Sequence, residues 1–185
     1  MMKKKLLFLA ALLLSVGASA QEISSGGSNG KRELMFYEAG MSVAPKQHNL
    51  TPYTADFTLG FQVTERLSLM ATCQGVLALY KDDVTRTYFE SNYGLGGGVG
   101  FTLFRGKSGA SFFNSNCALD LHAKVVASVG NVDWKYTQYD FGLTLYDYHR
   151  RGIYIPVTVG FRSIDSRTPG LRNYNNIYLR VAFGF

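Results

Sequence analysis

One short stretch of the chain combines an acid, an imidazole and an amine. It reads Asp120-Leu-His122-Ala-Lys124. Side chains two positions apart point to the same face of a β-strand, so a strand here would bring all three together. An aspartate that orients a histidine is the arrangement of a general base. The alternative is that the three groups form half of a structural salt-bridge network.

A second histidine, His48, lies in a connecting segment, and a later connection carries Asp82 and Asp83. Neither histidine has a serine placed with it in a way that indicates a nucleophile. The chain also has two cysteines without a histidine near them, which disfavours a metal site. The sequence therefore predicts a protein that is not an enzyme, with no catalytic, cofactor-binding or metal-binding residues.

The stretch from Tyr93 to Phe101, YGLGGGVGF, is rich in glycine. A phosphate-binding glycine loop joins a strand to the N-terminus of a helix. Here the glycines alternate with larger residues inside a single strand pattern. We therefore interpret them as relief of crowding on one face of that strand, and not as a nucleotide site.

The two cysteines are Cys73 and Cys117. A disulfide is the first hypothesis for an exported protein. However, the strand pattern places the two residues on strands two places apart, and a bridge needs Cα atoms within about 7 Å. The sequence therefore predicts two free, buried thiols.

The elements that hold these residues show a two-residue period. From Tyr53 to Thr64 the chain alternates between apolar and polar or very small residues, which indicates a strand with one apolar face. Similar runs recur along the chain, and none has convincing helical periodicity. We expect eight strands, at about 34–43, 53–64, 67–80, 89–104, 117–128, 136–146, 153–164 and 174–185.

The two faces of these predicted strands differ in character. In every run the apolar face falls on odd-numbered positions, and none of those positions is charged. The even positions hold most of the strand glycines and the charged residues. We predict that the even face carries a polar network inside a barrel, formed by Glu38, Asp56, Asp120, His122, Lys124, Asp140, Arg162 and Arg180.

Alternation alone fits two kinds of barrel. A soluble barrel turns its apolar face inward, and a membrane barrel turns it outward around a polar interior. The interior of an eight-stranded barrel is only just wide enough for side chains. Glycines on the even face would relieve this crowding, and large neighbours would share the space that is left, namely Tyr80, Phe104, Tyr146, Tyr154 and Tyr178. We therefore predict an all-β, eight-stranded, antiparallel, up-and-down transmembrane barrel.

The amino-terminal segment has the features of a secretory signal peptide. Three lysines precede a short apolar run, and Ala18-Ser19-Ala20 fits a cleavage site. The apolar run is too short for a spanning helix, which needs about 20 residues. We expect a signal peptide at 1–20 cleaved after Ala20, a flexible leader at 21–32 and a barrel domain at 33–185. Because the signal carries three lysines, it contributes half of the net charge of +6. The remaining basic residues are scattered among acidic ones, so we do not predict nucleic-acid binding.

The chain ends IYLRVAFGF, an alternating strand with a terminal aromatic residue. Together with the signal peptide and the eight strands, this ending resembles the small OmpA/OmpX-like outer-membrane β-barrel family of bacteria. The resemblance implies an outer-membrane location and contact with outer-membrane lipid. Basic residues of the connecting segments could in addition contact the phosphates of lipopolysaccharide, with ordinary solvated loop charge as the alternative; they are Lys46, Lys81, Arg86, Lys135, Arg167 and Arg172. It also implies recognition of the last strand by the barrel-assembly machinery, through Tyr178, Phe183 and Phe185.

Aromatic residues are expected in two girdles that flank the apolar band of such a barrel. On the outward face they fall into two groups, Tyr53, Tyr93 and Tyr139 toward one rim, and Tyr37, Phe101, Phe183 and Phe185 toward the other.

If the amino end lies in the periplasm, connections 44–52, 81–88, 129–135 and 165–173 face outside. Connection 105–116 is then longer than the short periplasmic turns of this class. Either it folds back into the fifth strand or the sidedness is reversed. We expect a structural role or interaction through the outer loops. A lipid A-modifying enzyme and a small-solute channel are the alternatives.

Overall fold

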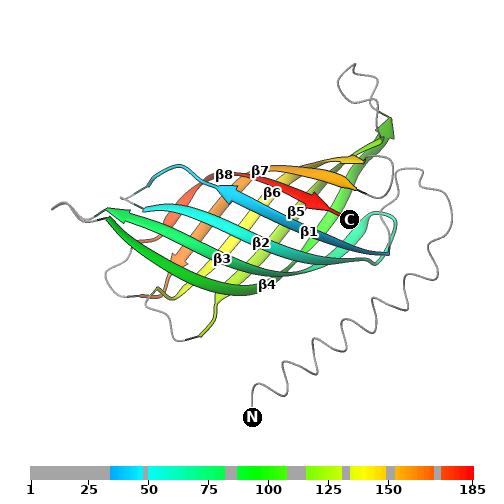
Figure 1. The fold of residues 1–185 in the computed structure, drawn as a ribbon. Helices are drawn as coiled ribbons and strands as arrows, with labels where there is room; N and C mark the ends of the chain where they lie inside the picture. Colours follow the sequence, from blue (N-terminus) through cyan, green and yellow to red (C-terminus); the bar gives the residue numbers. More distant parts are fainter. Residues whose placement is uncertain are drawn as a thin grey trace, which may run out of the picture.

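A computed structural model describes residues 34–47, 50–81, 87–107, 116–130, 134–148, 153–168 and 172–185. The predicted signal peptide and leader lie outside these residues, as do His48, Asp82 and Asp83. The chain forms one closed β-barrel (Figure 1). Within the described ranges, no helix is both long and apolar enough to cross a membrane.

The barrel has eight strands in chain order, and each pairs antiparallel with the next. They are β1 Met35–Val43, β2 Leu50–Gln62, β3 Leu67–Lys81, β4 Thr87–Lys107, β5 Asn116–Ser128, β6 Tyr136–Tyr148, β7 Tyr154–Ser166 and β8 Tyr174–Gly184. The prediction of an all-β, eight-stranded, antiparallel, up-and-down barrel is therefore confirmed.

The barrel closes where β8 returns to β1, and Figure 1 shows these two strands side by side. Met41 lies opposite Val181 in this seam. At the end of this seam where β1 begins, Tyr37 and Phe185 exchange two backbone hydrogen bonds of 3.1 Å, and their rings stack with centroids 5.8 Å apart. The last residue of the chain therefore takes part in closing the ring.

Burial alternates along the strands as the two-residue period requires. In β2, Thr58 is fully buried at 0% exposure while the neighbouring Phe57 is 42% exposed. Because the ring is closed, the buried even positions point into the barrel and the exposed odd positions point away from it. The outward face is consequently the apolar one, as the sequence predicts.

The strand β4 departs from this rule near its end. Its register against β5 shifts between Thr102 and Phe104, so that one extra residue is accommodated there. Such a β-bulge reverses the facing of every residue that follows it. Leu103 and Phe104 are both exposed, at 49% and 57%. The prediction that Phe104 lies inside the barrel is therefore wrong, and the side chain of Tyr80 lies outside the described residues.

The connection predicted at 105–116 is shorter than expected. Residues Arg105 to Lys107 still pair with Ala118 to Asn116, so both strands extend into the predicted connection. The strand β3 begins opposite Phe101, and β4 therefore runs past the end of β3 (Figure 1). Extension of the strands therefore accounts for part of the length of this connection, and the sidedness of the barrel stays a prediction.

Both cysteines are free, as predicted, but they are not buried. Cys73 is exposed and Cys117 is half-buried. Both occupy odd positions, which point away from the interior because the barrel turns its apolar face outward. No protein covers the Cys73 thiol and protein covers the Cys117 thiol only in part, so the prediction of buried thiols is wrong.

Two apolar clusters close the interior at opposite ends. One gathers at the end where β6 and β8 begin and contains Ala44, Val76, Trp134, Tyr136, Ile164, Tyr174 and Tyr178. The other gathers at the end where β1 and β7 begin and contains Phe36, Met70, Ala118, Tyr146 and Tyr154. Between them lies a polar layer, which separates the two ends of the barrel.

Aromatic rings in these clusters lie directly over glycines of neighbouring strands. The Phe36 ring occupies the space that a side chain at Gly60 would need, and the Tyr154 ring does the same at Gly184. An added Cβ would collide with the ring in both cases. By contrast, a Cβ at the outward-facing Gly75 would meet nothing within 4 Å. The interior glycines therefore make room for large rings in a narrow barrel.

Candidate functional site

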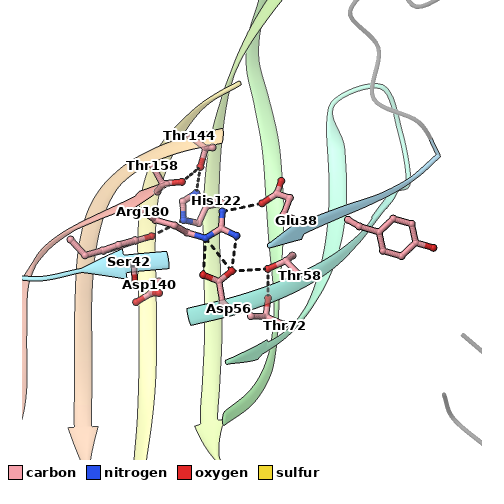
Figure 2. A network of polar contacts seen from close by, with 12 residues as sticks. Glu38, Ser42, Asp56, Thr58, Thr72, His122, Asp140, Thr144, Thr158 and Arg180 are labelled. Carbon is pink, nitrogen blue, oxygen red and sulfur yellow. Dashed lines mark hydrogen bonds and ion pairs between the residues drawn. The ribbon is translucent and has the colours of Figure 1, made fainter. Parts of the chain in front are cut away.

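The polar layer contains two arginines, and each is held by carboxylates from other strands. Arg180 on β8 donates to Asp56 on β2 through Nε at 2.9 Å and through Nη2 at 2.6 Å. Its Nη1 donates to Glu38 Oε2 on β1 at 3.0 Å. Figure 2 shows the guanidinium between these two acids. The side chains are 1–6% exposed, so these ion pairs are shielded from solvent.

Arg162 on β7 forms a second centre of the network. It makes a two-point contact with Asp140 on β6, with Nε to Oδ1 and Nη2 to Oδ2 both at 2.8 Å. Its Nη1 donates to Ser42 Oγ at 3.0 Å and to Thr54 Oγ1 at 3.1 Å. The guanidinium carbon lies 4.5 Å from the centre of the Tyr178 ring, a cation–π distance.

Neutral side chains extend the network on both sides of Asp140. Gln138 donates to Asp140 Oδ2 at 2.8 Å and accepts from Gln74 at 3.1 Å. Gln74 also donates to the Tyr136 hydroxyl at 3.2 Å, which joins the polar layer to the apolar cluster at that end. These contacts connect β3 to β6 through the interior of the barrel.

His122 is held by hydroxyl groups. Its Nε2 lies 2.9 Å from the Tyr178 hydroxyl, and its Nδ1 lies 3.0 Å from Thr144 Oγ1. Thr144 lies in turn 2.8 Å from Thr158 Oγ1, as Figure 2 shows. The imidazole is 6% exposed and both nitrogens face hydroxyls, so the ring is fixed in the interior.

Asp120 and Lys124 occupy the same inward face of β5 and are 3% and 8% exposed. Asp140 is the cross-strand neighbour of Lys124, but its two oxygens are taken by Arg162 and Gln138. Lys124 forms no ion pair with any other residue that the structure describes. The stretch from Asp120 to Lys124, in which the sequence allows a general-base arrangement, thus lies inside the closed barrel.

The structure therefore places all eight residues of the predicted polar network in one interior layer. Four carboxylates and three strong cations share this layer, so their charges nearly balance. An isolated charge in such a place would be very unfavourable, and the ion pairs of Arg162 with Asp140 and of Arg180 with Asp56 and Glu38 offset this cost for five of these residues. The geometry fits a cross-brace between strands that are distant in the sequence.

Sequence reasoning missed the neutral hydrogen-bonding partners in the network, and five of them are Ser42, Thr54, Gln74, Gln138 and Tyr178. Their shared signal was available, because all five stand at even positions. It was weak, since hydroxyl and amide side chains are also common on solvated strand faces.

The residues of the expected C-terminal signal divide between the two faces. Tyr178 is buried in the interior at 3% exposure, whereas Phe183 and Phe185 point outward at 62% and 60%. The outward aromatics Tyr93 and Tyr139 are likewise 68% and 49% exposed. Large aromatic side chains with no protein cover therefore lie on β4, β6 and β8.

Across the described part of the chain, no group of three or more histidine, cysteine, aspartate or glutamate side chains has the geometry to hold a metal ion. Neither a family model nor a curated protein sequence matches the chain. The account of function below consequently depends on the barrel, its two faces and its interior.

Proposed function

We propose that this chain is an integral outer-membrane β-barrel of a bacterium, with a closed interior and a structural or loop-mediated interaction role in the cell envelope. The observation that carries the proposal is the outward apolar face. Leu143, Val159 and Phe161 are 44%, 58% and 49% exposed, and similar side chains surround the whole ring. A continuous apolar surface of this extent is unfavourable in water and is expected on a protein that contacts lipid or another apolar partner.

The burial of charge supports the same proposal. Arg162 and Glu38 are 2% and 1% exposed, while the large side chains exposed on the outward face of the described strands are apolar or aromatic. A soluble barrel would have the opposite arrangement. The strands are also long enough, since a tilted transmembrane strand needs about 9–11 residues.

The filled interior favours a structural role over a channel. A solute would have to pass Tyr136 and Tyr174 at one end, the paired arginines in the middle, and Phe36 and Tyr154 at the other end. Displacing an arginine from its carboxylates would leave buried charges without partners, which is strongly unfavourable.

The connections near the β6 and β8 starts are tied to one another. Tyr174 donates its hydroxyl to Pro45 O at 2.6 Å, and Arg167 donates to Tyr136 O at 2.9 Å. Asn92 donates to the backbone oxygen of Trp134. A rim fixed in this way offers a preformed surface, which suits an interaction role.

Membrane fractionation tests the proposal. The full chain should separate with outer-membrane vesicles and resist extraction by high salt, and chemical cross-linking in the same sample would identify its neighbours. A matched pair of variants then tests the outward face. Leu143→Arg should cost about 2–4 kcal/mol if it meets the bilayer midplane, while Leu143→Val should have little effect. Recovery of the chain in the soluble fraction would contradict the proposal.

A further inference from the structure

A groove of about 780 Å³ crosses the outward face between β8 and β4. Its floor consists of three very small residues on adjacent strands, Ala39 on β1, Ala55 on β2 and Gly75 on β3. Ala55 and Gly75 lie directly opposite each other in the ladder. The groove lies where these small residues are surrounded by larger side chains on the outward face.

The walls of the groove are apolar. Phe57 and Phe183 lie on either side of Ala39 on the neighbouring strands. Met41 and Tyr93 lie in the same way on either side of the pair formed by Ala55 and Gly75. The inward-facing residues at the groove contribute to its floor from below. The outward lining thus has no charged group, and it suits a hydrocarbon chain.

The size of the groove favours a ligand with a flexible chain over a protein partner. Its volume lies within the range of about 300–1,000 Å³ that is typical of small-molecule sites. Fifteen residues line it, whereas a stable protein interface uses about 20–30 on each side. Two copies of the chain would also bring two concave surfaces together and leave a void between them. A flexible acyl chain fills such a space better.

Two exposed cations lie in segments that are hydrogen-bonded to the chain next to one end of the groove. Val129 lines this end, and its N–H donates to Tyr93 O at 2.9 Å. The preceding residue, Ser128, accepts from Arg167 Nη2 at 3.4 Å. The backbone N–H of Arg167 donates to Lys135 O at 2.7 Å, so the backbones of the two basic residues are adjacent, and Arg167 Nη2 also donates to Tyr136 O at 2.9 Å. The side chains of Lys135 and Arg167 are exposed at the rim of the barrel.

We propose that the groove and this basic pair form a binding site for one molecule of lipopolysaccharide. An acyl chain lies in the groove over Ala55 and Gly75, and a phosphate group contacts Lys135 and Arg167. Arginine and lysine are the side chains that bind phosphate most strongly. The inference rests on the proposed function, because this rim meets lipopolysaccharide only when the barrel spans an outer membrane.

The test measures binding of fluorescent lipopolysaccharide to the full-length barrel in detergent. Gly75→Leu fills the floor, and a side chain fits there because a Cβ at Gly75 meets nothing. We expect at least tenfold weaker binding for this variant. Lys135→Gln removes one phosphate-binding charge and should weaken binding about fivefold, the usual effect of one cation near an anionic lipid surface.

Two matched controls make the same kinds of change, added bulk and loss of one positive charge, at positions away from the proposed site. Val159→Leu adds bulk to the outward face away from the groove, and Arg66→Gln removes an exposed cation from the opposite rim. Both should bind lipopolysaccharide like the wild-type chain. The heat-dependent change in gel mobility of a folded barrel shows that each variant has folded.

Three outcomes would overturn the proposal. Binding by Gly75→Leu at the wild-type affinity would exclude the groove, and equal loss in Arg66→Gln would show that the charge effect is not local. Equal affinity for phosphatidylglycerol would remove the assignment to lipopolysaccharide. In each case membrane fractionation of the wild-type chain remains a separate measurement, so failure of this site and failure of the proposed function can be told apart.

Discussion

The ion pair between Arg162 and Asp140 provides a quantitative test of the interior. Replacing Asp140 with leucine removes both carboxylate oxygens that accept from the guanidinium at 2.8 Å. Among the described residues, Arg162 would then keep the Ser42 and Thr54 hydroxyls as hydrogen-bond partners and the Tyr178 ring as a cation–π contact, at 2% exposure. Each charge-assisted hydrogen bond contributes about 1.5–3 kcal/mol. We therefore expect Asp140→Leu to lower the free energy of unfolding by about 3–5 kcal/mol, the usual effect of leaving one buried charge unpaired.

A double-mutant cycle separates the pair from its surroundings. Arg162→Met alone should also be strongly destabilising, because Asp140 would then keep only Gln138 as a partner among the contacts described here. The variant with both Asp140→Leu and Arg162→Met should recover much of the loss, since an apolar pair of similar size tolerates burial. Asp140→Asn, which keeps an acceptor for Arg162, should lie between the wild type and Asp140→Leu.

The assay is urea unfolding of the barrel in lipid vesicles, with the free energy obtained by linear extrapolation. Effects of the two single replacements that simply add in the double variant would refute the reasoning. Single effects below about 1 kcal/mol would do the same, because that is the range of ion pairs exposed to water.

Three further predictions concern packing, conduction and closure of the barrel. Gly60→Ala should destabilise the fold by about 1–3 kcal/mol because the new methyl group collides with the Phe36 ring, whereas Gly75→Ala should be nearly neutral; equal unfolding free energies would argue against interior crowding. The wild-type chain in a planar bilayer should carry no steady current, and a stable open level would contradict an interior closed by two apolar clusters. Deleting Phe185 should slow refolding into vesicles, because it removes two backbone hydrogen bonds to Tyr37 and a ring contact; an unchanged rate would separate the end of the chain from closure of the seam.

The sequence predicts the fold well because one physical pattern recurs in every strand. Alternation from Tyr53 to Thr64 identifies β2, and the same period identifies the other seven strands to within a few residues. The facing of the strands could also be predicted, since glycines and charges share the even positions. Gly60, which lies under the Phe36 ring, shows why a small residue is needed on that face.

The errors occur where the pattern changes locally. A bulge after Thr102 turns Phe104 outward. The sequence has no proline or polar residue at this point that would indicate the bulge. The exposure of Cys73 follows directly from the outward apolar face, although the sequence predicts a buried thiol there.

The contacts within the polar network could be predicted only in part. The choice of Asp140 for Arg162, and of Asp56 and Glu38 for Arg180, depends on how the strands are staggered around the ring. Asp140 and Arg162 are cross-strand neighbours on β6 and β7, a pairing that strand order alone suggests. Arg180 instead contacts Asp56 across β1, and only closure of the barrel brings these two residues together.

The central claim is that hydrocarbon covers the outward face, and the chain offers its own probe position. Cys73 is exposed on that face, so a nitroxide spin label can be attached to it in a Cys117→Ser variant within lipid vesicles. Its collision rates with oxygen and with a water-soluble nickel chelate report the solvent around it. A label at Thr64→Cys, in an exposed turn of a variant without the two native cysteines, gives the aqueous reference. The account predicts frequent collisions with oxygen and few with the chelate at Cys73. Chelate collisions at Cys73 equal to those at the turn would contradict it.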